Sequence, residues 1–407
     1  MLRSLFSGIT GLRQHQTLMD VVSNNVANVN TVGFKSSSVV FQDTLSQMVK
    51  AAGAPGNGTG GINPAQVGLG VQLGAISTNF GQGSAQSTGK STDLMIQGDG
   101  FFVVRSGQTE AYTRAGSFSF DTNGRLTNPE GMVVQGWLPD PATGVLSTST
   151  APTDVILPAG TLIPPQKSSA ISLSGNITAS SATNDTMTLT QVTYDATGKP
   201  HPLTIKLTND GSGTNTYSVD ITDQSDGTTG TAGSVTFDAT GAITVNTPPD
   251  ITLNDGAGTP TLITFDLTKV TRYGGPQSLN VSAADGYAAG SLQGFQISAD
   301  GTVTGLYSNG QKLSMAKIAL ANFNNPMGLE KAGGSTFRAT VNSGNAQINA
   351  PGNGGVGTLL GGSVEMSNVD LAQEFTNLII AQRGFQANSR VITTSDTILQ
   401  DLVDLKR

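Results

Sequence analysis

Hydrophobic residues recur at helical spacing near the start of the chain. They are three or four positions apart, and the register shifts by one residue halfway along. This narrow stripe is typical of the contact seam of a coiled coil. Gly8 and Gly11 each weaken such a helix by about 1 kcal/mol when it stands alone, so the pattern predicts a helix that needs a partner. The seam positions are Leu2, Leu5, Ile9, Leu12, Met19, Val22, Val26 and Val29.

A second stripe of the same kind runs along the end of the chain. Alternating steps of four and three residues fall mostly on apolar side chains. We expect Ser367 or Asn368 to cap this helix, with Asp370 and Glu374 near the positive end of its dipole. Gly384 is its expected weak point. The apolar positions of this second seam are Leu371, Phe375, Leu378, Phe385, Ile392, Leu399 and Val403.

The chain between the two helices alternates apolar and polar residues in short runs, which is the pattern of half-buried β-strands. In several places an Asp followed closely by a Gly separates two such runs. Asp begins a turn and Gly supplies the positive φ that a hairpin requires, so these segments predict β-hairpins. They are MIQGDGFFVVR at 95–105, YTRAGSFSFDTNGRLTN at 112–128, VTYDATGKP at 192–200, VTFDATGAITV at 235–245 and FQISADGTVTGL at 295–306.

Gly-rich stretches at 51–71 and 349–362 lie just inside the two helices and are typical of linkers or extended arms. Together with an acidic, Thr-rich middle block, they predict an α+β fold, mainly β, in which one β-rich domain is nested inside another. The expected parts are a terminal helical core domain at 1–30 and 365–407, connecting arms at 31–75 and 349–364, an inner β domain at 76–144 and 275–348, and an inserted outer β domain at 145–274.

Charge and composition exclude several classes of protein. The net charge of −7 argues against binding to nucleic acid. The absence of cysteine excludes disulfides and zinc–sulfur sites. No apolar run reaches the length of a membrane span. The first residues lack the unbroken apolar segment and the cleavage site of a signal peptide, so we expect no cleaved signal peptide.

Nothing in the sequence supports catalysis. His15 and His201 are the two histidines, and neither has a partner at metal-ligand spacing, so both are expected at the surface. The GNGTGG segment at 56–61 resembles a phosphate-binding loop, but no strand precedes it and no helix follows it. We therefore expect a protein that is not an enzyme and has no cofactor or metal.

The terminal seams leave two interpretations open. Amphipathic helices usually pack on the core of their own chain. However, these seams are narrow and lie beyond Gly-rich arms at the two ends of the chain. We therefore favour helices that meet each other and other copies of the chain.

Four segments of the sequence resemble the signature segments of bacterial flagellar rod and hook proteins. Together they cover the first third and the last third of the chain, whereas the middle block matches no pattern. Distal rod members of this family lack a large central insertion, so the length of this chain resembles that of the hook members. The segments are SNNVANVNTVGFKSSSVVFQDTL at 23–45, GDGFFVV at 98–104, YTRAGSFSFDTNGRL at 112–126 and SNVDLAQEFTNLIIAQRGFQANSRVITTSDTILQDLV at 367–403.

The resemblance implies roles for the motif that ends the first helix. In this family the N-terminal helix pairs with the C-terminal one, and the chain then turns outward through an arm. The asparagines can satisfy open backbone groups at the helix end, the glycine allows the turn, and the phenylalanine can anchor the arm. The residues of this helix-end motif are Asn24, Asn25, Asn28, Gly33, Phe34 and Lys35.

The resemblance also implies a structural subunit that self-assembles into a curved tube, the flexible joint that transmits motor torque to the flagellar filament. Its implied partners are further copies of the chain, the distal rod, a hook cap, the hook–filament junction proteins and the type III export apparatus. The implied location is the extracellular part of the flagellum. The alternatives are a straight, rigid distal rod protein, or a secreted β-rich adhesin or enzyme that is fully folded as a monomer.

Overall fold

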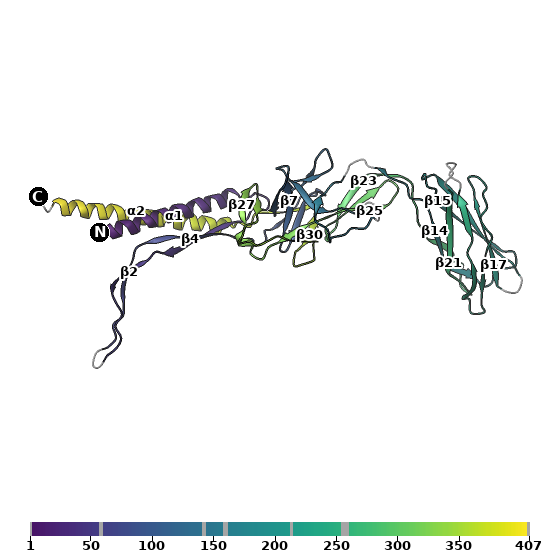
Figure 1. Ribbon diagram of the computed structural model, residues 1–407, viewed down its shortest axis with the longest axis horizontal. Helices are drawn as coiled ribbons and strands as arrows, with labels where there is room; N and C mark the ends of the chain where they lie inside the picture. The colour runs from purple at the N-terminus through teal and green to yellow at the C-terminus, as the bar shows by residue number, and fades with distance from the viewer. Residues whose placement is uncertain are drawn as a thin grey trace. The chain divides into compact units, whose positions relative to one another are not determined.

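The computed structural model describes residues 2–56, 60–140, 144–157, 162–211, 215–253 and 260–404. The chain forms two compact units. Unit 1 comprises Met1–Pro158, Gln296–Thr304 and Ser314–Arg407, and unit 2 comprises Ala159–Phe295 and Gly305–Leu313. Unit 2 is therefore inserted into the sequence of unit 1. Strands predominate and long helices occur at both ends (Figure 1), which confirms the predicted fold class.

Helices α1 (Leu2–Ala27) and α2 (Leu371–Asp404) lie side by side and antiparallel in unit 1 (Figure 1). Glycines allow their backbones to approach closely. A Cβ added to Gly384 would lie 2.3 Å from His15 Cε1, and one added to Gly11 would lie 2.8 Å from the side chain of Asn388. At Gly8 the corresponding distance to the Ile392 side chain is 3.3 Å. The glycines that were expected to weaken the isolated helices therefore lie at the contact between them.

One long, interrupted β-hairpin follows α1 as an arm. Its strands pair antiparallel, β1 with β4 and β2 with β3. Every residue of β2 and β3 is exposed. Residues 57–59 of the predicted GNGTGG linker lie outside the described residues. The strands of the arm are β1 (Ser37–Asp43), β2 (Ser46–Lys50), β3 (Ala65–Gly68) and β4 (Val71–Thr78).

The rest of unit 1 consists mainly of β strands and contains a core cluster that includes Phe101, Tyr112, Phe323 and Phe337. Neighbouring strands pair in the order β11-β7-β8-β28-β27. The strands are β5 (Ala85–Ser87), β6 (Leu94–Gln97), β7 (Phe101–Ser106), β8 (Thr109–Thr113), β9 (Ser119–Phe120), β10 (Leu126–Thr127), β11 (Val133–Trp137), β12 (Thr153–Asp154), β26 (Leu320–Asn322), β27 (Glu330–Gly333), β28 (Thr336–Arg338), β29 (Gln347–Asn349), β30 (Thr358–Gly361) and β31 (Ser363–Glu365), with a 3₁₀ helix η1 (Pro326–Gly328).

Residues 349–364, predicted as an arm, contain β30 and β31. These strands pair with β6 and β5, far earlier in the chain. The predicted hairpin at 112–128 is confirmed as β9 and β10. Asp121 Oδ1 accepts hydrogen bonds from the amides of Asn123 (2.8 Å) and Arg125 (2.7 Å), and Gly124 has a φ of 76°. The turn residues therefore act locally, as the sequence predicts.

Unit 2 is built mainly from two sheets, with strand orders β20-β21-β14-β22 and β15-β16-β17-β18-β19. The hairpins predicted at 192–200 and 235–245 are confirmed as β15–β16 and β18–β19. The strands are β13 (Leu162–Ile163), β14 (Ala170–Thr178), β15 (Thr186–Tyr194), β16 (Pro200–Asn209), β17 (Thr216–Asp223), β18 (Gly233–Phe237), β19 (Ile243–Thr247), β20 (Asp250–Leu253), β21 (Thr261–Tyr273), β22 (Asn280–Ala284) and β23 (Gly290–Ile297). Strand β23, together with β24 (Thr302–Tyr307) and β25 (Lys312–Ile318), contributes residues to both units.

His201 is buried in unit 2, so the expectation that it lies at the surface is wrong. Its ring nitrogen Nδ1 lies 2.6 Å from Asp223 Oδ2, and Nε2 lies 3.4 Å from Asp195 Oδ2. On β16, His201 alternates in phase with Leu203 and Ile205, which point into the core. The alternation of side chains along the strand therefore points the imidazole into the core, where it contacts two buried aspartates.

Candidate self-assembly surface

Asn25 joins the end of α1 to both the arm and α2. It is buried, and its Nδ2 donates to Ser37 O (2.8 Å) and to Glu374 Oε1 (2.9 Å). Its Oδ1 accepts from Ser37 N at 3.0 Å. Asn28 instead closes its own helix end, since its Nδ2 donates to Asn24 O at 2.9 Å. Of the asparagines in the helix-end motif, Asn25 thus connects α1 to the arm and to α2, whereas Asn28 bonds within the end of α1.

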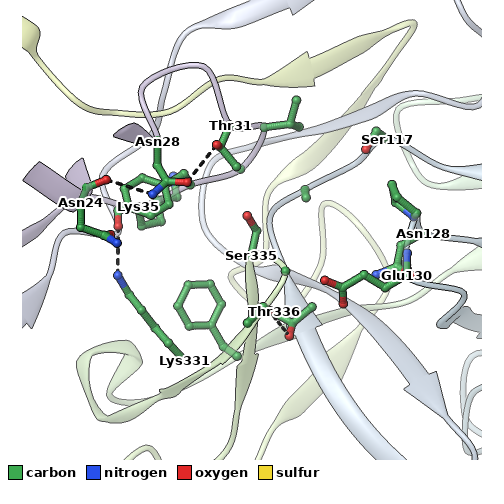
Figure 2. Close-up of a pocket in the computed structure, with 18 residues that line it drawn as sticks. Asn24, Asn28, Thr31, Lys35, Ser117, Asn128, Glu130, Lys331, Ser335 and Thr336 are labelled. Atoms are coloured by element: carbon green, nitrogen blue, oxygen red, sulfur yellow. Dashed lines mark hydrogen bonds between the residues drawn. The ribbon is translucent and has the colours of Figure 1, made fainter. Parts of the chain in front are cut away.

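Gly33 makes the sharp turn that follows α1. Its φ is 68°, and a Cβ there would lie 2.4 Å from Ala115 N. Phe34, next in the chain, has Lys331 Nζ at 5.1 Å from its ring centroid. Both residues line a pocket of about 460 Å³ between the motif and the β27–β28 hairpin, drawn in Figure 2. Only glycine combines this backbone angle with such a close approach.

Lys35 completes the motif with a buried ion cluster that the sequence did not predict. Its Nζ lies 2.6 Å from Glu365 Oε1 and donates to Gly81 O at 2.8 Å. Arg114 Nη1 lies 3.5 Å from the other oxygen of Glu365 and donates to Gly98 O at 2.9 Å. Burial lowers the pKa of Lys35 and of Arg114, although Glu365 opposes both shifts. The cluster ties the motif to the β strands and to the segment before α2.

Two further side chains fix the start of α2. Asp370 Oδ1 accepts from the amide of Ala372 at 2.9 Å, so Asp370 caps the helix. The prediction that Ser367 or Asn368 is the cap is wrong. Asn368 instead accepts from Ser36 N (2.9 Å) and donates to Asn79 O (2.8 Å), which holds the arm. No periodic signal marks Asn368 or Glu365, because their partners lie hundreds of residues away.

The two predicted seams behave differently in the helix pair. The side of α2 that contacts α1 carries Ala381, Gly384, Asn388, Ser395 and, from the predicted seam, Ile392. The contact stripe therefore overlaps the predicted one only in part. Along α1, Val22 is buried, whereas Leu5, Ile9, Leu12, Met19 and Val26 are half-buried. Along α2, Leu378, Ile392 and Leu399 are half-buried, whereas Leu371, Phe375, Phe385 and Val403 are exposed.

Apolar side chains without cover in the chain itself therefore gather on the helix pair and on the arm. We call this set the outer apolar surface. A monomer rarely exposes so many large apolar groups unless they mark an interaction site. On the helices they are Phe6, Leu371, Phe375, Ile379, Ile380, Phe385, Val391, Ile398 and Val403. On the arm they are Val40, Leu45, Met48, Val49, Ile62, Val67, Leu69, Leu73 and Ile76.

Among the described residues, no group of three or more His, Cys, Asp or Glu side chains is placed to hold a metal ion. In the same part of the chain, no helix is both long and apolar enough to cross a membrane. The chemistry that the structure does offer is apolar contact, backed by buried hydrogen bonds and ion pairs.

Four family models match successive parts of the chain. They are the flagella basal body rod protein at residues 5–35, the hook protein FlgE/F/G D1 domain at 95–179, the flagellar basal body protein FlaE D2 domain at 174–287 and the basal body rod FlgEFG protein C-terminal region at 360–405. The D2 match falls in the middle block, where the sequence suggested no family.

Complete proteins match as well. The flagellar hook protein FlgE of Treponema pallidum is 38% identical, with both chains covered in full. The flagellar basal-body rod protein FlgG of Bacillus subtilis is 32% identical over the whole of both chains. Among solved structures, the Helicobacter pylori hook protein FlgE2 shares the fold, with a TM-score of 0.55 and 15% identity over 67% of this chain and 98% of that one. The chain belongs to the family of flagellar hook proteins.

Proposed function

We propose that the outer apolar surface drives the assembly of this hook subunit into a curved, hollow tube that transmits motor torque to the filament. The exposure of Phe375, Ile379 and Ile380 on α2 carries this proposal, because these side chains stay uncovered even after α1 has packed. Burying one such side chain contributes about 1.5–3 kcal/mol. The gain has to offset the entropy of ordering the helices and the arm, about 1–2 kcal/mol per residue.

The geometry of the growing polymer follows from the type of contact. A head-to-tail contact between different surfaces of identical subunits does not close on itself, and repeated copies then form a helical filament. If α1 and α2 order only when neighbours cover them, a free subunit stays soluble and grows only on an existing end. Apolar helix faces at the tube interior and a self-contained unit 2 fit this arrangement.

The partners proposed for the tube follow from the family. A distal rod below, a cap during growth, junction proteins above and the type III export apparatus would each meet this subunit. The protein is part of the flagellum outside the cell, and we propose that it reaches this place without a cleaved signal peptide. A structural role in the tube requires no catalytic residue, and we propose that the chain is not an enzyme.

Truncation tests the proposal directly. Deletion of residues 1–30 or 371–407 is expected to abolish tube formation, because each deletion removes one of the two helices. Circular dichroism should show that the β strands persist, and electron microscopy should show no tubes. Normal tubes from either truncated chain would refute the proposal, and straight, stiff polymers of the full chain would favour the rod protein.

A single charge provides a finer test. Phe375 on α2 and Val245 on β19 of unit 2 are both 51% exposed, so they form a matched pair. Phe375→Asp is expected to prevent polymerisation without unfolding the monomer, because an unpaired charge would enter an apolar contact. Val245→Asp should polymerise normally. Equal polymerisation of the two variants in sedimentation experiments would contradict the assignment of the helices as the assembly surface.

A further inference from the structure

A groove of about 540 Å³ opens beside the helix pair in unit 1. The second half of α1, strand β1, the end of β4 and the first turns of α2 form its walls. Gln373, Glu374 and Asn377 of its lining are close in the sequence of α2 to Phe375 and Ile379 of the outer apolar surface. Its lining residues are Leu18, Val21, Val22, Ser36, Ser37, Ser38, Val39, Phe41, Ser77, Thr78, Asn79, Met327, Asn368, Asp370, Gln373, Glu374 and Asn377.

The groove is acidic. Asp370 and Glu374 line it, and its lining includes no lysine or arginine. Asp370 is occupied with capping α2. Glu374 accepts one hydrogen bond, from Asn25, through Oε1. Its other oxygen, Oε2, is out of contact with solvent and has no hydrogen-bond donor among the described residues. A carboxylate oxygen left in this state costs free energy that an incoming donor would recover.

Two cations on α2 lack carboxylate partners. Arg383 and Arg390 are exposed, and neither forms an ion pair within the described part of the chain. They follow Ala381, which is buried against α1, by two and nine residues. At 3.6 residues per turn, both lie on the opposite side of α2. Assembly through the outer face of α2 would desolvate these guanidinium groups, which is costly unless each meets a carboxylate.

We infer that this groove seats a guanidinium group from a second copy of the chain, supplied by Arg383 or Arg390 of that copy. The inference rests on the proposed function. The planar fork of arginine matches a carboxylate, and Glu374 lines the groove with one carboxylate oxygen that has no donor among the described residues. The donor and the acceptor lie on different faces of the subunit, so the contact runs head to tail and propagates along the polymer.

Charge exchange tests the inference. Glu374→Gln keeps an acceptor for Asn25 but removes the charge, and it is expected to raise the critical concentration for polymerisation about tenfold. Glu374→Arg should block assembly, and so should charge reversal of the one arginine that makes the contact, either Arg383→Glu or Arg390→Glu. Combining Glu374→Arg with the one arginine change that matches the true contact should restore tubes in electron microscopy. Asp20→Asn, which removes a charge from the exposed face of α1, serves as the control.

The outcomes separate this inference from the proposed function. Restored tubes from one double variant support the ion pair, and they also show that both substitutions together are compatible with a folded subunit. If Glu374→Gln polymerises at the wild-type concentration, or if neither double variant forms tubes, the inference is overturned. Phe375→Asp would still fail to polymerise in that case, so the proposed role of the outer apolar surface would stand. Tubes from Phe375→Asp would instead count against the proposed function itself.

Discussion

Unit 2 and the helix pair of unit 1 differ in how completely each buries its own apolar side chains. The two sheets of unit 2 enclose one continuous core in which side chains such as Ile205 and Tyr217 have no exposed surface. The helix pair contacts itself through Ala381, Gly384 and Asn388 and leaves Phe375 and Ile379 uncovered. The apolar core of unit 2 is thus buried within a single chain, whereas the helix pair leaves apolar side chains exposed.

This difference separates the tasks of folding and assembly within one sequence. Small residues between α1 and α2 give the pair its geometry, and large residues outside it remain available to neighbouring copies. A subunit whose helices hid these side chains in its own core would have nothing apolar left with which to polymerise. The comparison predicts that mutations in unit 2 affect stability and that mutations on the outside of α2 affect assembly.

The largest loss of stability is expected where the buried ion cluster supports the helix pair. Glu365→Ala leaves the buried cations of Lys35 and Arg114 without their carboxylate, at a cost of about 3–5 kcal/mol. Trp137, the one tryptophan, lies in unit 1, so its fluorescence can be used to follow the unfolding of this unit in urea. Lys331→Ala removes a neighbouring cation that is not paired with Glu365 and should cost far less. If Glu365→Ala unfolds at the same urea concentration as the wild type, the ion cluster does not stabilise unit 1 as described.

A pair of truncations to alanine tests the comparison itself. Ile205→Ala in the core of unit 2 is expected to lower the free energy of unfolding by about 2–5 kcal/mol. Phe375→Ala on α2 should change it by less than about 0.5 kcal/mol. Assembly should respond in the opposite order, with Phe375→Ala impaired and Ile205→Ala forming tubes at temperatures where it is folded. Thermal unfolding of monomers and sedimentation of polymers measure the two effects.

The close approach of the helices should be sensitive to one methyl group. Gly384→Ala improves helix propensity by about 1 kcal/mol, but its Cβ would meet His15. We expect a net destabilisation of the helix pair of about 1–3 kcal/mol from overpacking, seen as an earlier loss of helical circular dichroism on heating. Gly8→Ala has more room and serves as the control. Stabilisation by Gly384→Ala would show that the helices do not pack as closely as described.

The smallest effect is expected on acidification, and it should fall more on unit 2 than on unit 1. Burial raises the pKa of Asp195, but hydrogen bonds from Thr197 and Lys199 lower it by more. The amide and the hydroxyl of Thr268 lower the pKa of Asp266. Below-normal pKa values occur in unit 2 at Asp195, Asp226, Asp238, Asp266 and Asp285, and in unit 1 at Asp154 and Asp300.

The direction of this effect follows from proton linkage. Because the folded pKa values lie below the unfolded value of 3.8, the stabilisation is present above that pH and is lost as the pH falls through the folded values. Amide hydrogen exchange at decreasing pH should show unit 2 opening before the β strands of unit 1. Thr268→Val, which removes one hydroxyl donor, should reduce the acid sensitivity slightly. Opening of unit 1 first would refute the prediction.

The sequence predicted the elements whose causes are local. A hairpin such as that at Asp121 forms because one carboxylate and one glycine satisfy a turn within a few residues, and both are visible in sequence. The presence of both terminal helices was predicted equally well, since apolar spacing acts within a few turns, but the cap of α2 was not. The sequence identified the motif residues Asn25, Gly33 and Lys35, but it did not identify the residues that they contact.

The sequence by itself thus determined many of the strands and turns, the terminal helices and the family, because short-range periodicity and local motifs encode them. The hairpin predicted at 95–105 is wrong, because β6 pairs with β30 and not with β7. Only the tertiary structure decided that Lys35 meets Glu365, that His201 turns inward, and that the glycines of α1 and α2 form the contact while Phe375 stays outside. These outcomes depend on side chains separated by long stretches of chain. Their pairing is fixed by the packing of the whole unit, which no local pattern records.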